Sequence, residues 1–298
     1  MKKRTAIGSI IFFLGILLSV AIDGQQPNAP ASNRSSILIL GTGTPGITAE
    51  RSGTSIGIIV RGTVYIFDAG PGVERRMLEA RAKATTRIER FGPVFISHLH
   101  SDHTLGLPAM LYYDRERNQP FTLFGPPGLK NMMDHIVAAY AEDRDIRMKG
   151  LEHAPAVRWE TKVTEVTSGV VFQDANVTVK AFEVPHGNWE HALGYRIDAP
   201  DRSIVISGDT RPSEALVNAC NGCDVLLHEI GDRTMGPGPE YMAQFHTSPA
   251  ELGDIASRAK PKLLLLYHSA VRSQADALRE IGNGFHGSAI FVHDLDVF

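Results

Sequence analysis

A run of metal-binding side chains constrains this chain more than any other feature. Four such residues fall within six positions: His98, His100, Asp102 and His103. They follow a short apolar segment, Val94–Ser97, that is predicted to be a strand, and they precede a predicted helix at Leu105–Leu111. Imidazoles and a carboxylate crowded at a strand end destabilise one another unless a cation organises them. The alternative is an exposed polar loop, but the strand–loop–helix context favours a metal site.

The spacing within the run predicts two ions. His98 and His100 are two residues apart in extended chain, so their side chains point to the same side and can bind one ion. Asp102 and His103, at the turn into the helix, can face a second ion. Nitrogen and oxygen ligands suit two Zn²⁺ ions best, although manganese and iron accept the same ligands.

The rest of the pattern predicts an α/β fold. The strands expected in the first half are Ile37–Leu40, Ser55–Val60, Val64–Phe67 and Phe121–Phe124, and the helices are Val73–Ala84 and Leu129–Ala141. The strands expected in the second half are Val163–Val166, Val170–Phe172, Val177–Val184, Leu193–Ile197, Ile204–Ile206, Val225–Leu227 and Leu263–Leu266. Helices are expected at Pro212–Ala219 and Pro249–Arg258, the second with a capping box from Ser248 to Glu251. Each half therefore predicts a sheet with helices outside it, which together make a four-layer α/β sandwich.

The N-terminus has the three-part layout of a secretory signal peptide. Lys2, Lys3 and Arg4 precede an apolar run from Ala6 to Val20, and small residues end that run. We predict a signal peptide over residues 1–21, a flexible linker over 22–35 and a metal-binding domain over 36–298. The protein would then be exported, to the periplasm or out of a bacterial cell. A retained membrane anchor is the alternative, although the apolar run is short for a spanning helix.

Charge and cysteine content restrict the partners and the compartment. The net charge of −3, without a basic stretch beyond Met1–Arg4, argues against binding to nucleic acid or anionic membranes. Cys220 and Cys223 form a C-x-x-C pair after a predicted helix. A local disulfide is the expectation in an oxidising compartment, with two free buried thiols as the alternative. A redox site would open a helix, and this pair follows one.

Five motifs, in order along the chain, resemble those of the metallo-β-lactamase superfamily. The H-x-H-x-D-H run resembles its signature, and the others are Ile66-Phe67-Asp68-Ala69-Gly70, Val184-Pro185-His186-Gly187, Ser207-Gly208-Asp209-Thr210 and Tyr267-His268-Ser269. Each lies at the end of a predicted strand. The resemblance implies the four-layer αββα sandwich of the metallo-β-lactamase fold.

The resemblance also implies roles for individual residues. The first ion would take His98, His100 and His186, and the second would take Asp102, His103 and His268. Asp209 would bridge both ions together with a water or hydroxide, which Asp102 would orient for attack. Asp68 would accept a hydrogen bond from the free N–H of a ligand histidine.

Three further motifs resemble the ribonuclease Z/arylsulfatase-like branch: Leu40-Gly41-Thr42-Gly43-Thr44-Pro45, Leu227-His228-Glu229 and Phe245-His246-Thr247-Ser248-Pro249. The resemblance makes His246 the general acid for the leaving group and Glu229 the residue that orients it. The alternative for His246 is a packing role beside the helix cap at Ser248. His228 is expected to be buried and structural.

Within this branch, three observations favour a small substrate over tRNA. The chain is predicted to be exported, it lacks a basic tract, and between Gly125 and Val163 we expect one helix plus a short stretch, Asp143–Glu160, instead of a long arm. Gly125-Pro126-Pro127-Gly128 and Tyr140-Ala141-Glu142-Asp143 also resemble exported arylsulfatase-like members. We therefore predict a hydrolase of small sulfate esters or phosphodiesters, with no nucleic-acid partner and no membrane contact beyond the export signal. Trp189 and Tyr113 are candidates, by position, for the apolar wall of the pocket that holds the leaving group. A homodimer is compatible with the resemblance.

The alternatives come from more than one class. A ribonuclease Z-type tRNA 3′ endonuclease belongs to the same branch, and a lactonase shares the ligands but does not need His246 and Glu229 in this arrangement. A zinc β-lactamase in the strict sense lacks the bridging aspartate. A metal-bound scaffold without activity is the non-enzyme alternative, and it would keep its ligand after Asp209→Ala.

Overall fold

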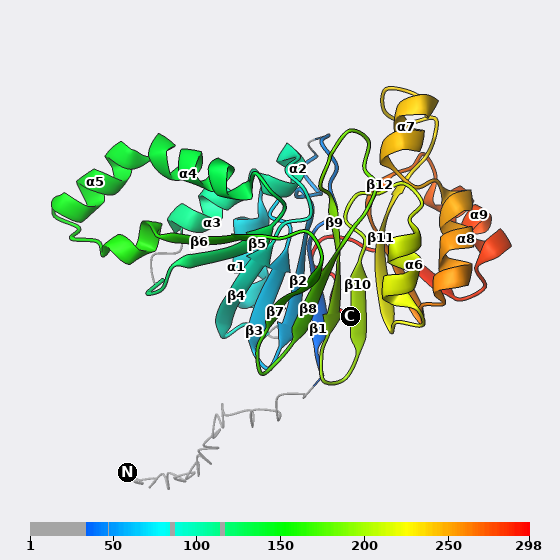
Figure 1. Cartoon of the computed structure of the whole chain (residues 1–298), viewed down its shortest axis with the longest axis horizontal. Helices are drawn as coiled ribbons and strands as arrows, with labels where there is room; N and C mark the ends of the chain where they lie inside the picture. Colours follow the sequence, from blue (N-terminus) through cyan, green and yellow to red (C-terminus); the bar gives the residue numbers. More distant parts are fainter. Residues whose placement is uncertain (1–33, 47, 84–86, 114–116) are drawn as a thin grey trace, which may run out of the picture. The chain divides into compact units, whose positions relative to one another are not determined.

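Two sheets packed face to face form the centre of the computed structural model (Figure 1). The structure describes residues 34–46, 48–83, 87–113 and 117–298, and Asn33–Phe298 makes one compact unit. The predicted signal peptide and most of the predicted linker lie outside the described residues. Within the described ranges, no helix has the length and apolar character needed to cross a bilayer.

The first sheet has the order β1-β2-β3-β4-β5-β6. Its strands are β1 (Ser36–Gly41), β2 (Ser55–Val60), β3 (Thr63–Phe67), β4 (Arg90–Phe95), β5 (Phe121–Gly125) and β6 (Thr161–Glu165). The pairs from β1 to β3 are antiparallel and those from β3 to β6 are parallel. Parallel neighbours end at the same edge of a sheet, so the segments that follow β3, β4 and β5 gather there.

The second sheet has the order β13-β12-β11-β10-β9-β8-β7. Its strands are β7 (Gly169–Gln173), β8 (Thr178–Glu183), β9 (Leu193–Asp198), β10 (Ser203–Ile206), β11 (Val225–Gly231), β12 (Leu263–Ala270) and β13 (Ser288–Phe291). The pairs from β7 to β10 are antiparallel and those from β10 to β13 are parallel. The carboxyl ends of β10, β11 and β12 therefore also share one edge.

Alternation along the strands builds three apolar layers. Ile37 and Ile39 of β1 face the second sheet, whereas Leu38 and Leu40 face the helices outside the first. Because both faces of β1 are buried, its central residues Ile37–Leu40 are apolar without interruption. Between the sheets, the rings of Phe67 and Phe95 stack with centroids 4.9 Å apart.

Helices cover the outer face of each sheet and complete the four layers (Figure 1). The first sheet is covered by α1 (Val73–Ala82), α3 (Leu107–Tyr113) and α4 (Leu129–Ala139). The second is covered by α6 (Glu214–Cys220), α8 (Pro249–Ala259) and α9 (Gln274–Gly284). The predicted αββα sandwich is confirmed, as is the capping box in which Ser248 and Glu251 begin α8.

The structure differs from the sequence prediction between β5 and β6. The prediction of one helix and a short stretch there is wrong, because α4 is followed by α5 (Ala141–Lys149) and a 3₁₀ helix, η1 (Ala156–Trp159). The α4–α5 pair extends away from the sheets (Figure 1), and α5 has no buried residue. A helix without a buried face lacks the apolar spacing on which the prediction depended.

Four other elements were not predicted: α2 (Ser101–Thr104), α7 (Pro239–Phe245), α9 and β13. In addition, β6, expected with the strands of the second half, pairs with β5 of the first sheet. The expected local disulfide is confirmed, since Cys220 and Cys223 are bonded and buried where α6 ends.

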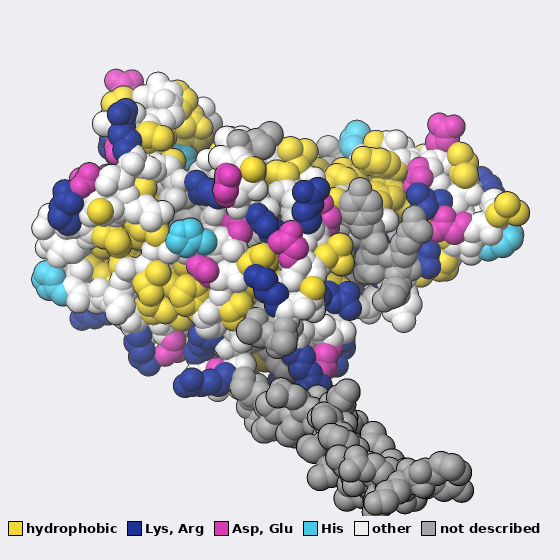
Figure 2. Space-filling view, turned by 180° about the vertical axis from the view of Figure 1, so that it is seen from behind, with side chains coloured by type: hydrophobic (Ala, Val, Ile, Leu, Met, Phe, Trp, Pro, Cys, Tyr) yellow, Lys and Arg dark blue, Asp and Glu magenta, His cyan; other side chains and the backbone are white. Residues whose placement is uncertain are grey.

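The charged side chains show no separation by sign on the face seen in Figure 2. Lys and Arg are interspersed with Asp and Glu among the described side chains of that face. Among the described residues, charged side chains also form short-range pairs, such as Lys130 with Asp134 and Arg147 with Asp143. The mixture of both signs leaves little long-range field on the face seen in Figure 2.

Candidate metal centre

The predicted ligands follow four strands that end at one edge of the sandwich. His98, His100, Asp102 and His103 follow β4, and Asp102 and His103 lie in the short helix α2 (Ser101–Thr104). His186 follows β8, Asp209 follows β10, and His268 lies near the end of β12. The helices α2 and α7 are both at this edge (Figure 1). Residues up to 170 positions apart in the sequence are therefore brought to one place.

One group of side chains consists of His98, His100, His186 and Asp209, and their ligand atoms lie within 4.8 Å of one another. His98 Nε2 is 2.8 Å from His100 Nδ1, which is 3.3 Å from His186 Nε2. His186 Nδ1 donates to the carbonyl of Phe245 over 2.8 Å, which leaves Nε2 directed at the group. Three imidazoles and a carboxylate at this spacing can hold one divalent cation.

A second group consists of Asp102, His103 and His268, again within 4.8 Å. His268 Nε2 is 3.0 Å from Asp102 Oδ2 and 3.4 Å from Asp209 Oδ2. His103 Nε2 is 3.4 Å from the other oxygen of Asp209, Oδ1. Asp209, a member of the first group, therefore also borders the second. Its Oδ1 lies near His103 and its Oδ2 lies near His268.

Asp68 is positioned to orient His103. Its Oδ2 is 2.8 Å from His103 Nδ1 and accepts from Ser97 Oγ over 2.8 Å, while Oδ1 accepts from the Ser97 N–H over 2.7 Å. With Nδ1 occupied in this way, Nε2 of His103 is the atom left for a ligand.

Two residues of the centre hold unusual backbone conformations. Asp68 has φ +59° and His268 has φ +42°, although neither is glycine. The register between β11 and β12 also shifts between His228 and Ile230, because β12 has one more residue there. A bulge re-aims the side chain it contains, and this one includes His268. Strained backbone of this type concentrates at functional sites.

Unpaired buried atoms test whether the residues fit a metal. His103 Nε2 and Asp209 Oδ1 are both buried without a hydrogen-bond partner. A buried donor or acceptor without a partner is unfavourable, and these two atoms lie in the groups just described. A divalent cation would satisfy both at once, so the donor set fits a dinuclear metal site.

The electrostatics favour the same conclusion. Burial lowers the pKa of His98 well below its ordinary range and that of His186 to about 4, so both rings keep a free lone pair. Burial would also lower the pKa of His103, but Asp209 and Asp68 override it and raise the pKa well above the ordinary value. The two carboxylates therefore stabilise the protonated, positively charged ring of His103, although it is buried. A metal cation can take the place of that proton.

His246 and Glu229 form a pair at the border of the centre. His246 Nδ1 lies 3.1 Å from Glu229 Oε2, and Glu229 Oε1 accepts from the Thr247 N–H over 2.8 Å. His246 also comes within 4.8 Å of the ligand atoms of Asp209 and His268. Burial alone would lower the pKa of His246, but the Glu229 carboxylate overrides it and raises the pKa to about 9. His228 is buried, as expected.

Other residues around the centre were missed or only partly anticipated. Trp189, a candidate wall by its position in the sequence, donates from Nε1 to His100 Nε2 over 2.9 Å. The Phe245 carbonyl that holds His186 belongs to α7, which was not predicted. A backbone carbonyl leaves no signal in residue type, so no pattern could have identified it. The side chain of Tyr113, the other candidate wall, lies outside what the structure describes.

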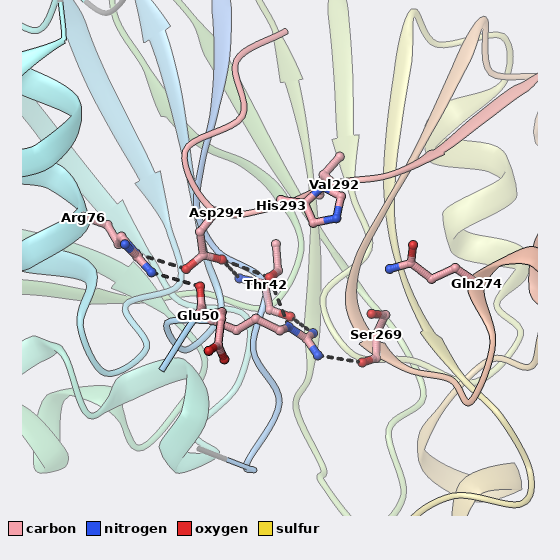
Figure 3. A pocket seen from close by; sticks show the side chains of 9 residues that line it. Thr42, Glu50, Arg76, Ser269, Gln274, Val292, His293 and Asp294 are labelled. Atoms are coloured by element: carbon pink, nitrogen blue, oxygen red, sulfur yellow. Dashed lines mark hydrogen bonds and ion pairs between the residues drawn. The ribbon is translucent and has the colours of Figure 1, made fainter. Parts of the chain in front are cut away.

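A separate cavity of about 290 Å³ lies beside the loop that follows β1 (Figure 3). It is lined by Thr42, Glu50, Arg51, Arg76, Ser269, Gln274, Val292, His293 and Asp294. Asp294 accepts from the N–H and hydroxyl of Thr42 and from Arg76, and Arg51 donates to the Ser269 carbonyl over 3.2 Å. These bonds anchor the Leu40–Pro45 motif next to the residue that follows His268. The lining contains none of the predicted ligands.

Comparison with known proteins identifies the family. A sequence profile described as a beta-lactamase superfamily domain matches residues 63–269, which is most of the chain. The chain belongs to the metallo-β-lactamase superfamily. Ribonuclease Z of Mycobacterium sp. strain KMS is 30% identical over 243 residues, which cover 78% of this chain and 83% of that protein. Ribonuclease Z of Methanosarcina mazei is 24% identical over 294 residues, covering 80% and 89%.

Solved structures share the fold. The metallo-beta-lactamase fold protein YhfI from Bacillus subtilis superposes with a TM-score of 0.69 at 15% identity, covering 89% of this chain and 98% of that one. The short form of human tRNase Z superposes with a TM-score of 0.66 at 23% identity, covering 88% and 98%. Together with the ribonuclease Z relatives, the profile makes this chain a metal-dependent hydrolase that acts on ester bonds.

The comparisons also correct one prediction. A small-molecule substrate with no nucleic-acid partner was expected, but the relatives are named ribonucleases, whose substrate is RNA. The expectation was wrong because it relied on net charge, which describes the whole chain and not the surface around one site. It also relied on the expectation that no long arm lies between Gly125 and Val163, whereas the α4–α5 pair occupies that region.

Proposed function

We propose that this protein is an RNA phosphodiesterase of the ribonuclease Z type with two zinc ions. The observation that carries the proposal is the shared position of Asp209 between two groups of ligands, with the His246–Glu229 pair at their border. The first group suits one ion and the second suits another, as the sequence motifs imply. A lactonase would share the metal ligands, but it would not need His246 and Glu229 in this arrangement.

Seven residues would hold the ions: His98, His100, Asp102, His103, His186, Asp209 and His268. When bound, two such ions would lower the pKa of a water in the centre and would neutralise charge on the phosphoryl oxygens. Asp68 keeps His103 in the tautomer that presents Nε2 to the centre, and the Phe245 carbonyl does the same for His186. Asp102, 3.0 Å from His268, is placed to orient the attacking water.

His246 would donate a proton to the leaving oxygen. Its Nδ1 is held by Glu229, so the other ring nitrogen remains available to the substrate. Glu229 is fully buried and is fixed by the Thr247 N–H, so it can hold the ring in one orientation. A phosphodiester needs such an acid, because an alkoxide is a poor leaving group until it is protonated.

Two further points belong to the proposal. The named activity of the relatives supports a phosphodiester substrate over a sulfate ester. The charged start and apolar run of residues 1–21 support export, which would place the enzyme with RNA outside the cytoplasm.

Cleavage of three matched substrates tests this function. The zinc-loaded protein is given a tRNA precursor with a 3′ trailer, bis(nitrophenyl) phosphate and nitrophenyl sulfate, each with and without a chelator. We expect chelator-sensitive cleavage of the RNA and of the phosphodiester, and no turnover of the sulfate. Asp209→Ala should reduce the RNA cleavage rate about a thousandfold or more.

The matched control is Asp254→Ala, which removes an exposed carboxylate on α8 and should leave the rate unchanged. Turnover of the sulfate alone would overturn the RNA proposal in favour of an arylsulfatase. Loss of all turnover with two zinc ions bound would favour a scaffold.

A further inference from the structure

The helix α7 places two aromatic rings against the first group of ligands. Tyr241 and Phe245 are four residues apart on α7 and so share one side of the helix. Their rings are stacked, with centroids 4.3 Å apart and planes inclined by 15°. Phe245 in turn meets the ring of His186 edge to face, with centroids 5.1 Å apart. A continuous aromatic layer therefore runs from a ligand histidine to Tyr241.

Several contacts fix this layer in place. The Phe245 carbonyl accepts from His186 Nδ1, and the Gln244 carbonyl accepts from the Gly187 N–H over 2.9 Å. Gly187 has φ +53°, and a Cβ at this position would lie 2.1 Å from the Phe245 ring. Gly187, which follows His186 in the loop after β8, thus leaves space for the ring of Phe245. The backbone of this loop therefore fixes where the ring lies.

Packing does not account for Tyr241. The buried residue of α7 is Met242, which anchors the helix, whereas Tyr241 is 38% exposed. One face of its ring is covered by Phe245, and the exposed part remains available. Burial raises the pKa of the Tyr241 phenol, and the carboxylates Asp209 and Asp102 raise it further.

We propose that Tyr241, supported by Phe245, is the specificity-determining residue on which a base of the RNA stacks beside the scissile phosphate. This rests on the proposed function, since the phosphate would occupy the metal centre. Bases of single-stranded RNA are recognised by stacking on aromatic side chains, and any base can use its ring face in this way. This aromatic platform, formed by Tyr241 stacked on Phe245, therefore favours an unpaired nucleotide next to the bond that is cut, whichever base that nucleotide carries.

Binding of two small probes tests the platform without requiring turnover. Adenosine 5′-monophosphate and ribose 5-phosphate share the phosphate and sugar, and only the first has a base. We expect the zinc-loaded full chain to bind the nucleotide about tenfold more tightly than the sugar phosphate, as measured by calorimetry. Tyr241→Phe should keep this preference, because the ring remains, and Tyr241→Leu should abolish it while leaving the affinity for ribose 5-phosphate the same.

The matched control is Tyr140→Leu, which removes another exposed tyrosine, at the junction of α4 and α5. It should retain the tenfold preference. Equal affinity of the wild type for both probes, or a preference that persists in Tyr241→Leu, would overturn the platform. A preference that depends on Tyr241 in a protein that cuts no RNA would instead leave the platform standing and contradict the proposed function. Failure of both probes to bind would contradict both.

Discussion

His100 has its two ring nitrogens in different surroundings. Nδ1 faces His98 and His186, whereas Nε2 accepts a hydrogen bond from Trp189 Nε1. A neutral imidazole that accepts at Nε2 carries its proton on Nδ1. Nδ1 is also the nitrogen that faces the other ligands and would bind zinc, so zinc binding would require the ring proton to move to Nε2 and would break the bond from Trp189.

Zinc binding should therefore change the fluorescence of Trp189. Once its indole N–H loses His100 as an acceptor and turns to water, we expect the emission to shift to longer wavelength as zinc is added. The chain has one other tryptophan, Trp159, which is buried in η1. Trp189→Phe should bind zinc without this shift. Stoichiometric zinc binding with an unchanged wild-type spectrum would contradict the assignment.

The pairing of His246 with Glu229 predicts a pH dependence. Burial opposes protonation, but Glu229 raises the pKa of His246 to about 9. A general acid must hold its proton, so turnover should persist below this pKa and fall as the pH rises through it. Glu229→Gln keeps the shape and removes the charge. We expect the alkaline limb of the kcat profile to move to lower pH by about one unit or more.

Glu240→Gln, which removes an exposed charge in the first turn of α7, is the matched control and should leave the alkaline limb in place. If the limb of Glu229→Gln also stays where it is, His246 is not the acid.

At the residue scale, the predictable part of the centre is the part encoded by side chains. His98 through His103 are contiguous, and Asp209 and His268 follow strands that the sequence shows clearly. The orienting bond from the Phe245 carbonyl could not be predicted, because any residue offers a carbonyl. Tyr241 was also missed, since exposed aromatic residues are common and only the fold brings this one to the centre.

At the scale of elements, the strands were easier to predict than the helices that border the site. The buried strands β10, β11 and β12 each contain a short, continuous apolar run, namely Ile204–Ile206, Val225–Leu227 and Leu263–Leu266, which few other structures explain. The short helix α7 follows Gly236-Pro237-Gly238, has only 7 residues and buries one of them, so it is too short for the apolar periodicity on which helix prediction depends. By contrast α9 does have a cap at Ser273 and buried residues at Ala277 and Ile281, a pattern that the sequence contained.

The Cys220–Cys223 disulfide should stabilise the junction between α6 and β11. It closes a loop with a sequence separation of only 3, for which loop entropy gives about 2 kcal/mol. We expect Cys220→Ala/Cys223→Ala to lower the free energy of unfolding in urea by about this amount. A reducing agent should destabilise the wild type similarly and leave the double variant unaffected. A wild type whose stability does not respond to the reducing agent would contradict a structural role.

At the scale of the whole molecule, the centre joins the two halves of the sandwich. The residues from His98 to His103 come from the first sheet, and His186, Asp209 and His268 come from the second. The layers could be predicted because each half alternates strands and helices. The substrate could not be predicted in the same way, because charge totals do not describe the surface beside the site.

Zinc titration of the chelator-stripped protein tests the central claim most directly. Cleavage of the tRNA precursor is followed together with bound zinc and thermal stability as zinc is added. We predict that turnover returns as the bound metal rises to two ions per chain and then stops increasing. The melting temperature should rise over the same range, because the ions bind only the folded centre. Full turnover by the metal-free chain, or none with two zinc ions bound, would contradict the account.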